Sequence, residues 1–103
     1  MDGQTGIEMP KYECHKKVWA LQIKSIVFDW VVALEQKRET DGSAMVTPVE
    51  EGYAPFKVNL DFVRKHLRTV HPEVVVGGYY VVYEDGYKSF SPQKAFEEGY
   101  TRL

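Results

Sequence analysis

The last third of this chain contains the feature that most constrains its fold. Residues 77–83 read Gly-Gly-Tyr-Tyr-Val-Val-Tyr and are followed by Glu-Asp-Gly and a second aromatic run. Aromatic and β-branched residues favour strands, and Asp-Gly after such a run is typical of a tight turn. The sequence therefore predicts an antiparallel hairpin of Tyr79–Tyr83 with Tyr87–Phe90, in which each good cross-strand tyrosine pair contributes up to about 1 kcal/mol.

Helical signals follow the hairpin directly. Ser91 is expected to cap a final helix that begins at Pro92 and ends at Gly99, with Ala95 and Phe96 as its core anchors. The remaining residues are expected to form a short extended tail. On the other side of the hairpin, the paired glycines at 77 and 78 predict a bend, a bulge or the close approach of another backbone.

Two earlier segments read as strands. Lys16–Ile26 is apolar on both faces, which indicates a central strand. Ala44–Thr47 is a short strand ended by Pro48. Together with the hairpin, these two strands predict a small antiparallel sheet, and Phe56–Val58 is expected to be a brief extended piece outside it.

The clearest internal helix is Leu60–Arg68, because Asn59 is a good N-cap and three apolar residues recur at helical spacing. His71-Pro72 should stop it. The apolar residues expected to share its buried face are Leu60, Val63 and Leu67.

Phe28–Lys37 is ambiguous, since its first half favours strand and its second half favours helix. We expect a short helix capped by Asp29 and leave a strand open. The residues that would pack this helix on the sheet are Trp30, Val31 and Leu34.

The fold class predicted is therefore α+β: a small antiparallel sheet with a C-terminal hairpin and two or three short helices. At 103 residues the chain has room for one domain, which we place at residues 11–103, after a flexible N-terminal extension of residues 1–10. The net charge of −2 argues against general nucleic-acid or anionic-membrane binding, because neutralising phosphates needs a surplus of Lys and Arg.

The chain has no apolar stretch near the roughly 20 residues that span a bilayer, and its first residues do not resemble a signal peptide. Cys14 is the only cysteine, so an internal disulfide is excluded. These observations favour a cytoplasmic protein.

The chain contains no strong catalytic or metal-binding pattern. Cys14, His15, His66 and His71 do not match zinc-ligand spacing. The adjacent carboxylates at 50–51, 84–85 and 97–98 are typical of solvated surfaces, and phosphate-binding loops are absent. We therefore expect no enzyme activity, no metal and no cofactor.

The best candidate site combines aromatic rings with cations, as stacked bases, phosphates or protein hot spots require. Filling of the core by the tyrosines is the stronger alternative, because strands favour aromatic residues. Strand parity puts Tyr79 and Tyr83 on one face and Tyr80 on the other, so one set stays exposed if a single face is covered. The candidate residues are Arg64, Lys65, Arg68, Tyr79, Tyr80, Tyr83, Tyr87 and Lys88, with His66 among the nearby cations.

Several segments together resemble a family of small uncharacterised accessory proteins of tailed bacteriophages and prophages. The family pattern has an early K-x-V-x-A strand, a later G-x-Y-x-V strand and a final F-x-x-x-Y segment. The matching segments here are Lys17–Ile23, Met45–Pro48, Gly78–Val82, Tyr87–Pro92 and Ala95–Tyr100. The resemblance implies a small α+β protein without established catalytic residues.

The same resemblance implies a non-enzymatic binding or inhibitory protein that acts on host machinery in the bacterial cytoplasm, with counter-defence as one such role. Its partner would be a host protein or a small anionic ligand such as a nucleotide. The alternative is a virion or assembly component that self-associates, with Trp30, Tyr53 and the hairpin aromatics as interface residues.

Overall fold

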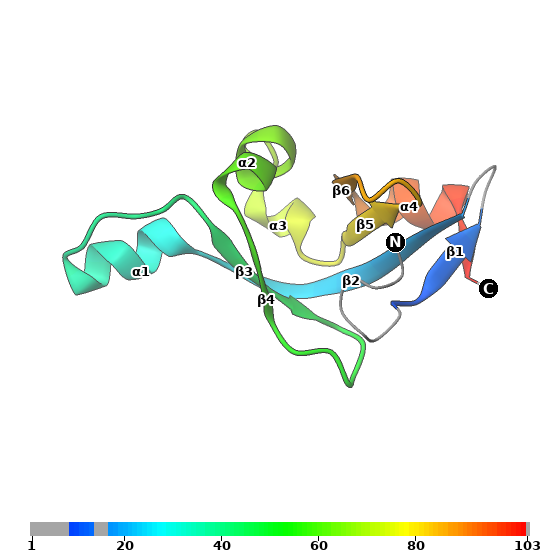
Figure 1. The fold of residues 1–103 in the computed structure, drawn as a ribbon, viewed down its shortest axis with the longest axis horizontal. Helices are drawn as coiled ribbons and strands as arrows, with labels where there is room; N and C mark the ends of the chain where they lie inside the picture. Colours follow the sequence, from blue (N-terminus) through cyan, green and yellow to red (C-terminus); the bar gives the residue numbers. More distant parts are fainter. Residues whose placement is uncertain (1–8, 14–16, 103) are drawn as a thin grey trace.

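The computed structural model of the chain describes residues 9–13 and 17–102 and has a small α+β fold (Figure 1). Seven antiparallel strands form one sheet. They are β1 (Lys11–Glu13), β2 (Lys17–Phe28), β3 (Ala44–Pro48), β4 (Phe56–Val58), β5 (Tyr79–Tyr83), β6 (Lys88–Ser91) and β7 (Thr101–Arg102). The helices are α1 (Asp29–Gln36), α2 (Leu60–Phe62) with the π-helical turn η2 (Val63–Leu67), α3 (Pro72–Val75) and α4 (Gln93–Gly99).

Strand β2 organises the sheet by changing partners along its length. Its first half pairs with β5, from Val18 opposite Tyr83 to Gln22 opposite Tyr79. Its outer half pairs with β3, and the register shifts between Ile23 and Ser25. The predicted strand Lys16–Ile26 is therefore confirmed as central, but it runs two residues further, and Lys16 lies outside the described residues.

Both faces of the hairpin strand β5 are buried. On one face, Tyr80 and Val82 join a core with Val46, Phe62 and Val75. On the other face, Tyr79 and Val81 join a second core formed with Val18, Ala20 and Phe96. One strand thus supplies alternate side chains to two hydrophobic cores, as the period-2 geometry of a strand allows.

The predicted hairpin and its turn are confirmed, with the return strand one residue later than expected. Tyr87 lies in the turn, where its backbone N–H donates to Asp85 Oδ1 at 2.9 Å, and Gly86 has a φ of 90°. Gly78 is the position of close approach. A Cβ there would lie 2.5 Å from Cε1 of Phe90 and 2.9 Å from the carbonyl oxygen of Ser91.

The final helix is present and ends at Gly99, as predicted, but the predicted start of the helix is wrong. Ser91 belongs to β6, where it pairs with Tyr79, and Pro92 occupies the N-cap position without a side-chain cap. The ladder bonds of the hairpin extend through Ser91 and take precedence over capping. Ala95 is exposed and not an anchor, whereas Phe96 is fully buried.

Asn59 caps the internal helix as predicted, because the backbone N–H of Phe62 donates to its Oδ1 at 3.0 Å. Phe62 and Leu67 are the buried residues of α2 and η2. The expected burial of Leu60 is wrong. The chain also turns into the short helix α3 at Pro72, where the sequence had indicated only an apolar run.

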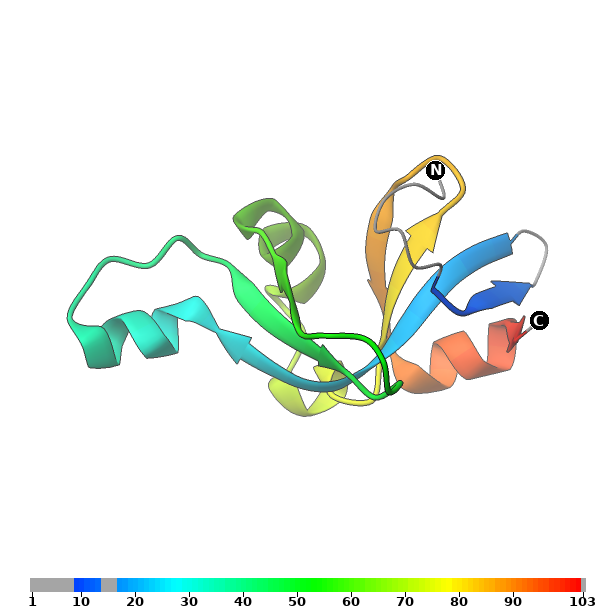
Figure 2. The same cartoon turned by 60° about the horizontal axis from the view of Figure 1, so that its bottom comes forward.

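Helix α1 projects beyond the sheet at one end of the molecule, and α4 lies at the other end (Figure 2). The molecule measures 45 × 29 × 25 Å. We call residues 24–48, which comprise the outer part of β2, α1 and β3, the arm. The helix prediction for this segment is confirmed, but the expected packing of Trp30, Val31 and Leu34 on the sheet is wrong. All three are exposed, because α1 lies past the sheet edge.

Two residues that the sequence assigned to the N-terminal extension contact the folded domain. Met9 packs against the larger core, and the backbone N–H of Ala20 donates to the Pro10 carbonyl at 2.9 Å. Residues 1–8 and the pair Cys14-His15 lie outside the described residues. None of the helices within the described residues is long and apolar enough to cross a bilayer.

Candidate functional site

Two of the four candidate tyrosines are core residues. The Tyr79 ring stacks on Phe96 with centroids 4.1 Å apart, and its hydroxyl donates to Glu97 Oε2 at 2.7 Å. Tyr80 packs between Phe56 and Phe62 on the opposite face. Both side chains are buried, and burial raises the pKa of both hydroxyls. Strand parity predicted that one set of tyrosines would stay exposed if only one face of the sheet were covered. Both faces are covered at this position, so both sets are buried.

The other two tyrosines meet at the turn of the hairpin, where the Tyr83 N–H donates to the Tyr87 carbonyl at 2.9 Å. The rings of Tyr83 and Tyr87 are stacked with centroids 6.0 Å apart. Tyr87 also contacts His66 of η2, with its hydroxyl oxygen 3.3 Å from Nε2. Tyr87 is 49% exposed. A pair of rings from the hairpin is thus held against a helix that lies 21 residues earlier in the chain.

Exposed basic residues precede and follow the two contacting residues His66 and Tyr87 in the sequence. Lys88 follows Tyr87 directly, and its backbone hydrogen-bonds with His66. Lys65 is paired with Asp61 at 3.4 Å, whereas within the described residues Arg64 and Arg68 form no ion pair. We call this group the hairpin surface. Its residues are Arg64, Lys65, His66, Arg68, Tyr83, Tyr87 and Lys88.

His66 is not one of the cations at neutral pH. Partial burial lowers the pKa of its imidazole below the ordinary value of 6.5, and the charge of Lys65 lowers it further. A neutral imidazole offers one donor and one acceptor nitrogen, which suits a hydrogen bond with the Tyr87 hydroxyl. The role of His66 is therefore to hold Tyr87 in place, and the positive charge of the surface comes from its arginines and lysines.

A hollow of about 490 Å³ lies beside the hairpin turn. Its lining is of mixed charge: Lys17, Tyr83, Glu84, Asp85 and Tyr87. Two carboxylates against one ammonium group disfavour a phosphate or another anion in this space. The hollow is therefore a poor match for the small anionic ligand that the sequence left open.

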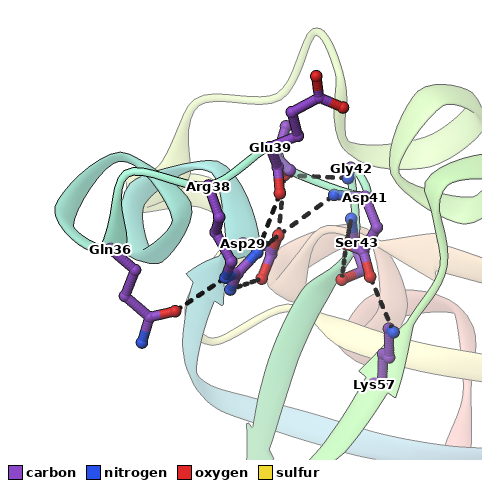
Figure 3. A network of polar contacts seen from close by, with 9 residues as sticks. Asp29, Gln36, Arg38, Glu39, Asp41, Gly42, Ser43 and Lys57 are labelled. Atoms are coloured by element: carbon purple, nitrogen blue, oxygen red, sulfur yellow. Dashed lines mark hydrogen bonds and ion pairs between the residues drawn. The ribbon is translucent and has the colours of Figure 1, made fainter.

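A second group of polar residues forms a network in the arm, between α1 and the loop that follows it (Figure 3). The guanidinium of Arg38 donates two hydrogen bonds to Asp29, at 2.9 and 3.0 Å. The Thr40 hydroxyl donates to the same carboxylate at 2.9 Å. Asp29 therefore joins α1 to the loop that follows it and is not the N-cap that we expected; Phe28 is at that position.

The neighbouring carboxylate continues the network toward β4. Asp41 accepts from the backbone N–H of Ser43 at 2.9 Å and lies 2.9 Å from Lys57 Nζ. Hydrogen bonds with Ser43 and Lys57 lower the pKa of Asp41 to about 2, and those with Arg38 and Thr40 hold the pKa of Asp29 far below its usual range. Both groups stay ionised at neutral pH, so the network orients the arm and offers no general acid.

Replacing Asp29 with asparagine is expected to loosen the arm selectively. Folding lowers the pKa of Asp29, so its contribution to stability is present above the ordinary pKa of 3.8 and is lost as the pH falls below it. Amide hydrogen exchange of α1 should accelerate in Asp29→Asn while that of β5 stays unchanged. The free energy of unfolding should also depend less on pH below about pH 4 than in the wild type. Equal pH dependence in the two proteins would contradict this role, and Glu39→Gln is the control.

Other charged groups serve structural contacts as well. Glu50 binds Arg102, joining the loop after β3 to the C-terminal strand, and Glu97 accepts from Tyr79. Within residues 9–13 and 17–102, no three His, Cys, Asp or Glu side chains gather in a way that would hold a metal ion. The structure brings together only some of the predicted site residues: Tyr83, Tyr87 and Lys88 meet His66 at the hairpin turn, whereas Tyr79 and Tyr80 are in the core.

Neither the exposure of Tyr87 nor its contact with His66 follows from local sequence. The only signal was the clustering of cations in the helix and tyrosines in the hairpin. Comparisons of the chain with protein-family models, with curated proteins and with solved structures found no match.

Proposed function

We propose that this protein is a non-enzymatic binding protein that attaches to a protein partner through the hairpin surface. One observation carries the proposal: Tyr87 is half exposed yet held in place by Tyr83 and His66, and the helical turn that contains His66 also carries exposed arginine and lysine residues. Tyrosine and arginine are the residues most enriched among interface hot spots. A ring that is already fixed loses little conformational entropy on binding.

A protein partner fits the geometry better than a small anion. The nearby hollow is lined by two carboxylates, and the cations lie on the outer side of η2. A flat acidic surface can reach these cations while an apolar group rests on Tyr87. The partner that matches is therefore a protein with carboxylates around an apolar contact point.

The resemblance to phage accessory proteins indicates the kind of partner and the place where the protein would act. Small phage proteins without catalytic residues act by occupying host proteins, and counter-defence in the host cytoplasm is one such role. This setting is an inference from family likeness, whereas the binding surface is inferred from residue chemistry.

Affinity capture from bacterial lysate tests the proposal with matched variants. The wild type should recover a stoichiometric partner that is released by high salt, because the contact uses charge. Tyr87→Ala and Arg64→Glu should each lower recovery at least about tenfold, as hot-spot losses do. Lys94→Glu makes the same charge change on exposed α4 and should have no effect. Recovery that is equal for all four proteins would contradict the proposal.

A nucleotide panel tests the competing ligand class. Ligand binding to the native state raises the melting temperature. If any nucleotide stabilises the wild type and not Arg64→Glu, the small-ligand alternative replaces the protein partner.

A further inference from the structure

The arm carries a concentration of exposed apolar side chains that the hairpin surface does not explain. Five of the ten large hydrophobic residues exposed within the described residues lie in it. Leu34 is 74% exposed and Trp30 is 57% exposed. The five residues, which we call the arm patch, are Val27, Trp30, Val31, Leu34 and Met45.

The arrangement of the arm patch follows from its elements. Val27 and Met45 are directly opposite each other on β2 and β3. Trp30 and Leu34 are four residues apart on α1, so they lie on one side of the helix. Only Ala33 of α1 is buried. The helix thus turns its smallest apolar residue inward and leaves its largest ones in solvent, the reverse of a helix that stabilises its own domain.

We infer that the arm patch is the interface of a homodimer, with a second copy of this chain as its occupant. Area is the first argument. Multiplying the full surface area of each of the five side chains by its exposed fraction gives about 500 Å² of exposed apolar surface in total. This area is near the upper end for a single apolar patch on a monomer. Two copies in contact bury about 1,000 Å² from these residues alone, which reaches the lower limit for a specific interface before any polar rim is added.

Charge is the second argument. The arm contains three basic and four acidic residues, and Lys57 of β4 binds Asp41 at 2.9 Å. The arm is therefore close to neutral and does not select a strongly charged partner. Two arms can meet without net repulsion, and a two-fold axis lets the same residues occupy both sides of the contact.

Dimerisation through the arm gives the assembled protein two hairpin surfaces. The arm lies at one end of the 45 Å long axis, away from the hairpin and α4 (Figure 2). Two copies joined through their arms keep both hairpin surfaces accessible. The assembled protein is then bivalent, so a partner that presents two sites at matching spacing is held more tightly than by one copy.

Light scattering after gel filtration, over micromolar to sub-millimolar protein, tests the inference. The wild type should be a dimer at high concentration. Leu34→Glu should raise the dimer dissociation constant at least about tenfold, because it places a charge in the apolar contact. At protein concentrations low enough for the wild type to be monomeric, its melting temperature should equal that of the wild type, since Leu34 is exposed and glutamate is a good helix former. Val76→Glu, at an apolar residue that is 47% exposed outside the arm, is the matched control and should remain dimeric.

Cross-linking checks the location of the contact independently. In a Cys14→Ser background, Leu34→Cys should form an intermolecular disulfide faster than Val76→Cys. A wild type that stays monomeric throughout would overturn the inference, as would equal weakening by the two glutamate variants. Loss of a captured partner in Leu34→Glu with a monomeric wild type would assign the arm patch to another protein. Because Tyr87→Ala should remain dimeric, failure of the dimer is distinguishable from failure of the hairpin surface.

Discussion

Phe96→Ala is expected to destabilise the protein by about 3–5 kcal/mol, the usual cost of removing a fully buried phenylalanine. Phe96 is 1% exposed and contacts three rings, with centroids 4.1 Å away for Tyr79, 4.6 Å for Tyr100 and 4.8 Å for Tyr12. These rings belong to β5, the C-terminal segment and β1. One side chain thus joins α4 to two strands of the sheet and to the residue that precedes β7, and its loss leaves a cavity among the three rings.

Urea denaturation measures this effect. The midpoint should fall sharply, and hydrogen exchange of α4 should approach that of an unprotected helix. Val76→Ala removes apolar atoms from an exposed position outside the arm patch and should change stability by no more than about 0.5 kcal/mol. A cost below about 1 kcal/mol for Phe96→Ala would mean that the second core is not a stabilising unit.

Gly78→Ala is expected to cost about 2–3 kcal/mol, because it inserts a methyl group where there is no space. The added Cβ would lie 2.5 Å from Phe90 Cε1, 2.7 Å from Phe90 Cζ and 2.9 Å from the Ser91 carbonyl oxygen. The ring can turn aside, but the carbonyl is fixed by the β5–β6 ladder. The strain must therefore displace the hairpin backbone.

Gly99→Ala is the control for this substitution, since no atom lies within 4 Å of its added Cβ. That variant should be neutral or slightly more stable. In the double variant Gly78→Ala/Phe90→Ala, the clash with the ring disappears while the clash with the carbonyl remains. Unchanged stability in Gly78→Ala would show that the close approach at this position has no energetic weight.

Elements whose signals are local were predicted well from the sequence. The Asp-Gly turn, the Asn59 cap and the helix end at Gly99 depend on a few neighbouring residues. Ser91 shows the limit of such signals, because a good capping residue was recruited into a strand by its partner Tyr79.

Elements that depend on distant partners were predicted less well. The apolar spacing of Trp30, Val31 and Leu34 is that of a packed helix, but the sheet ends before α1 and leaves the three side chains in solvent. Burial of both Tyr79 and Tyr80 requires cover on two faces, which strand parity alone cannot reveal. The contact of Tyr87 with His66 joins residues 21 apart, and no local pattern encodes it.

The exposure of the basic candidate residues could be predicted from the sequence, because charged residues at a helix surface are normally exposed. Lys65, Arg64 and Arg68 are indeed exposed on η2 and at its end. The sequence could not show which tyrosines are exposed, and their burial restricts the candidate site to the turn of the hairpin, where Tyr83 and Tyr87 lie.

The central claim is that the hairpin surface binds a protein partner, and site-specific photo-cross-linking in bacterial cells tests it most directly. A photoreactive phenylalanine replaces Lys88 in one protein and Lys94 in another, both exposed in the wild type. We predict a single cross-linked adduct with another protein from position 88, lost when Arg64→Glu is added, and none from position 94. An adduct from position 94 with none from position 88 would contradict the account.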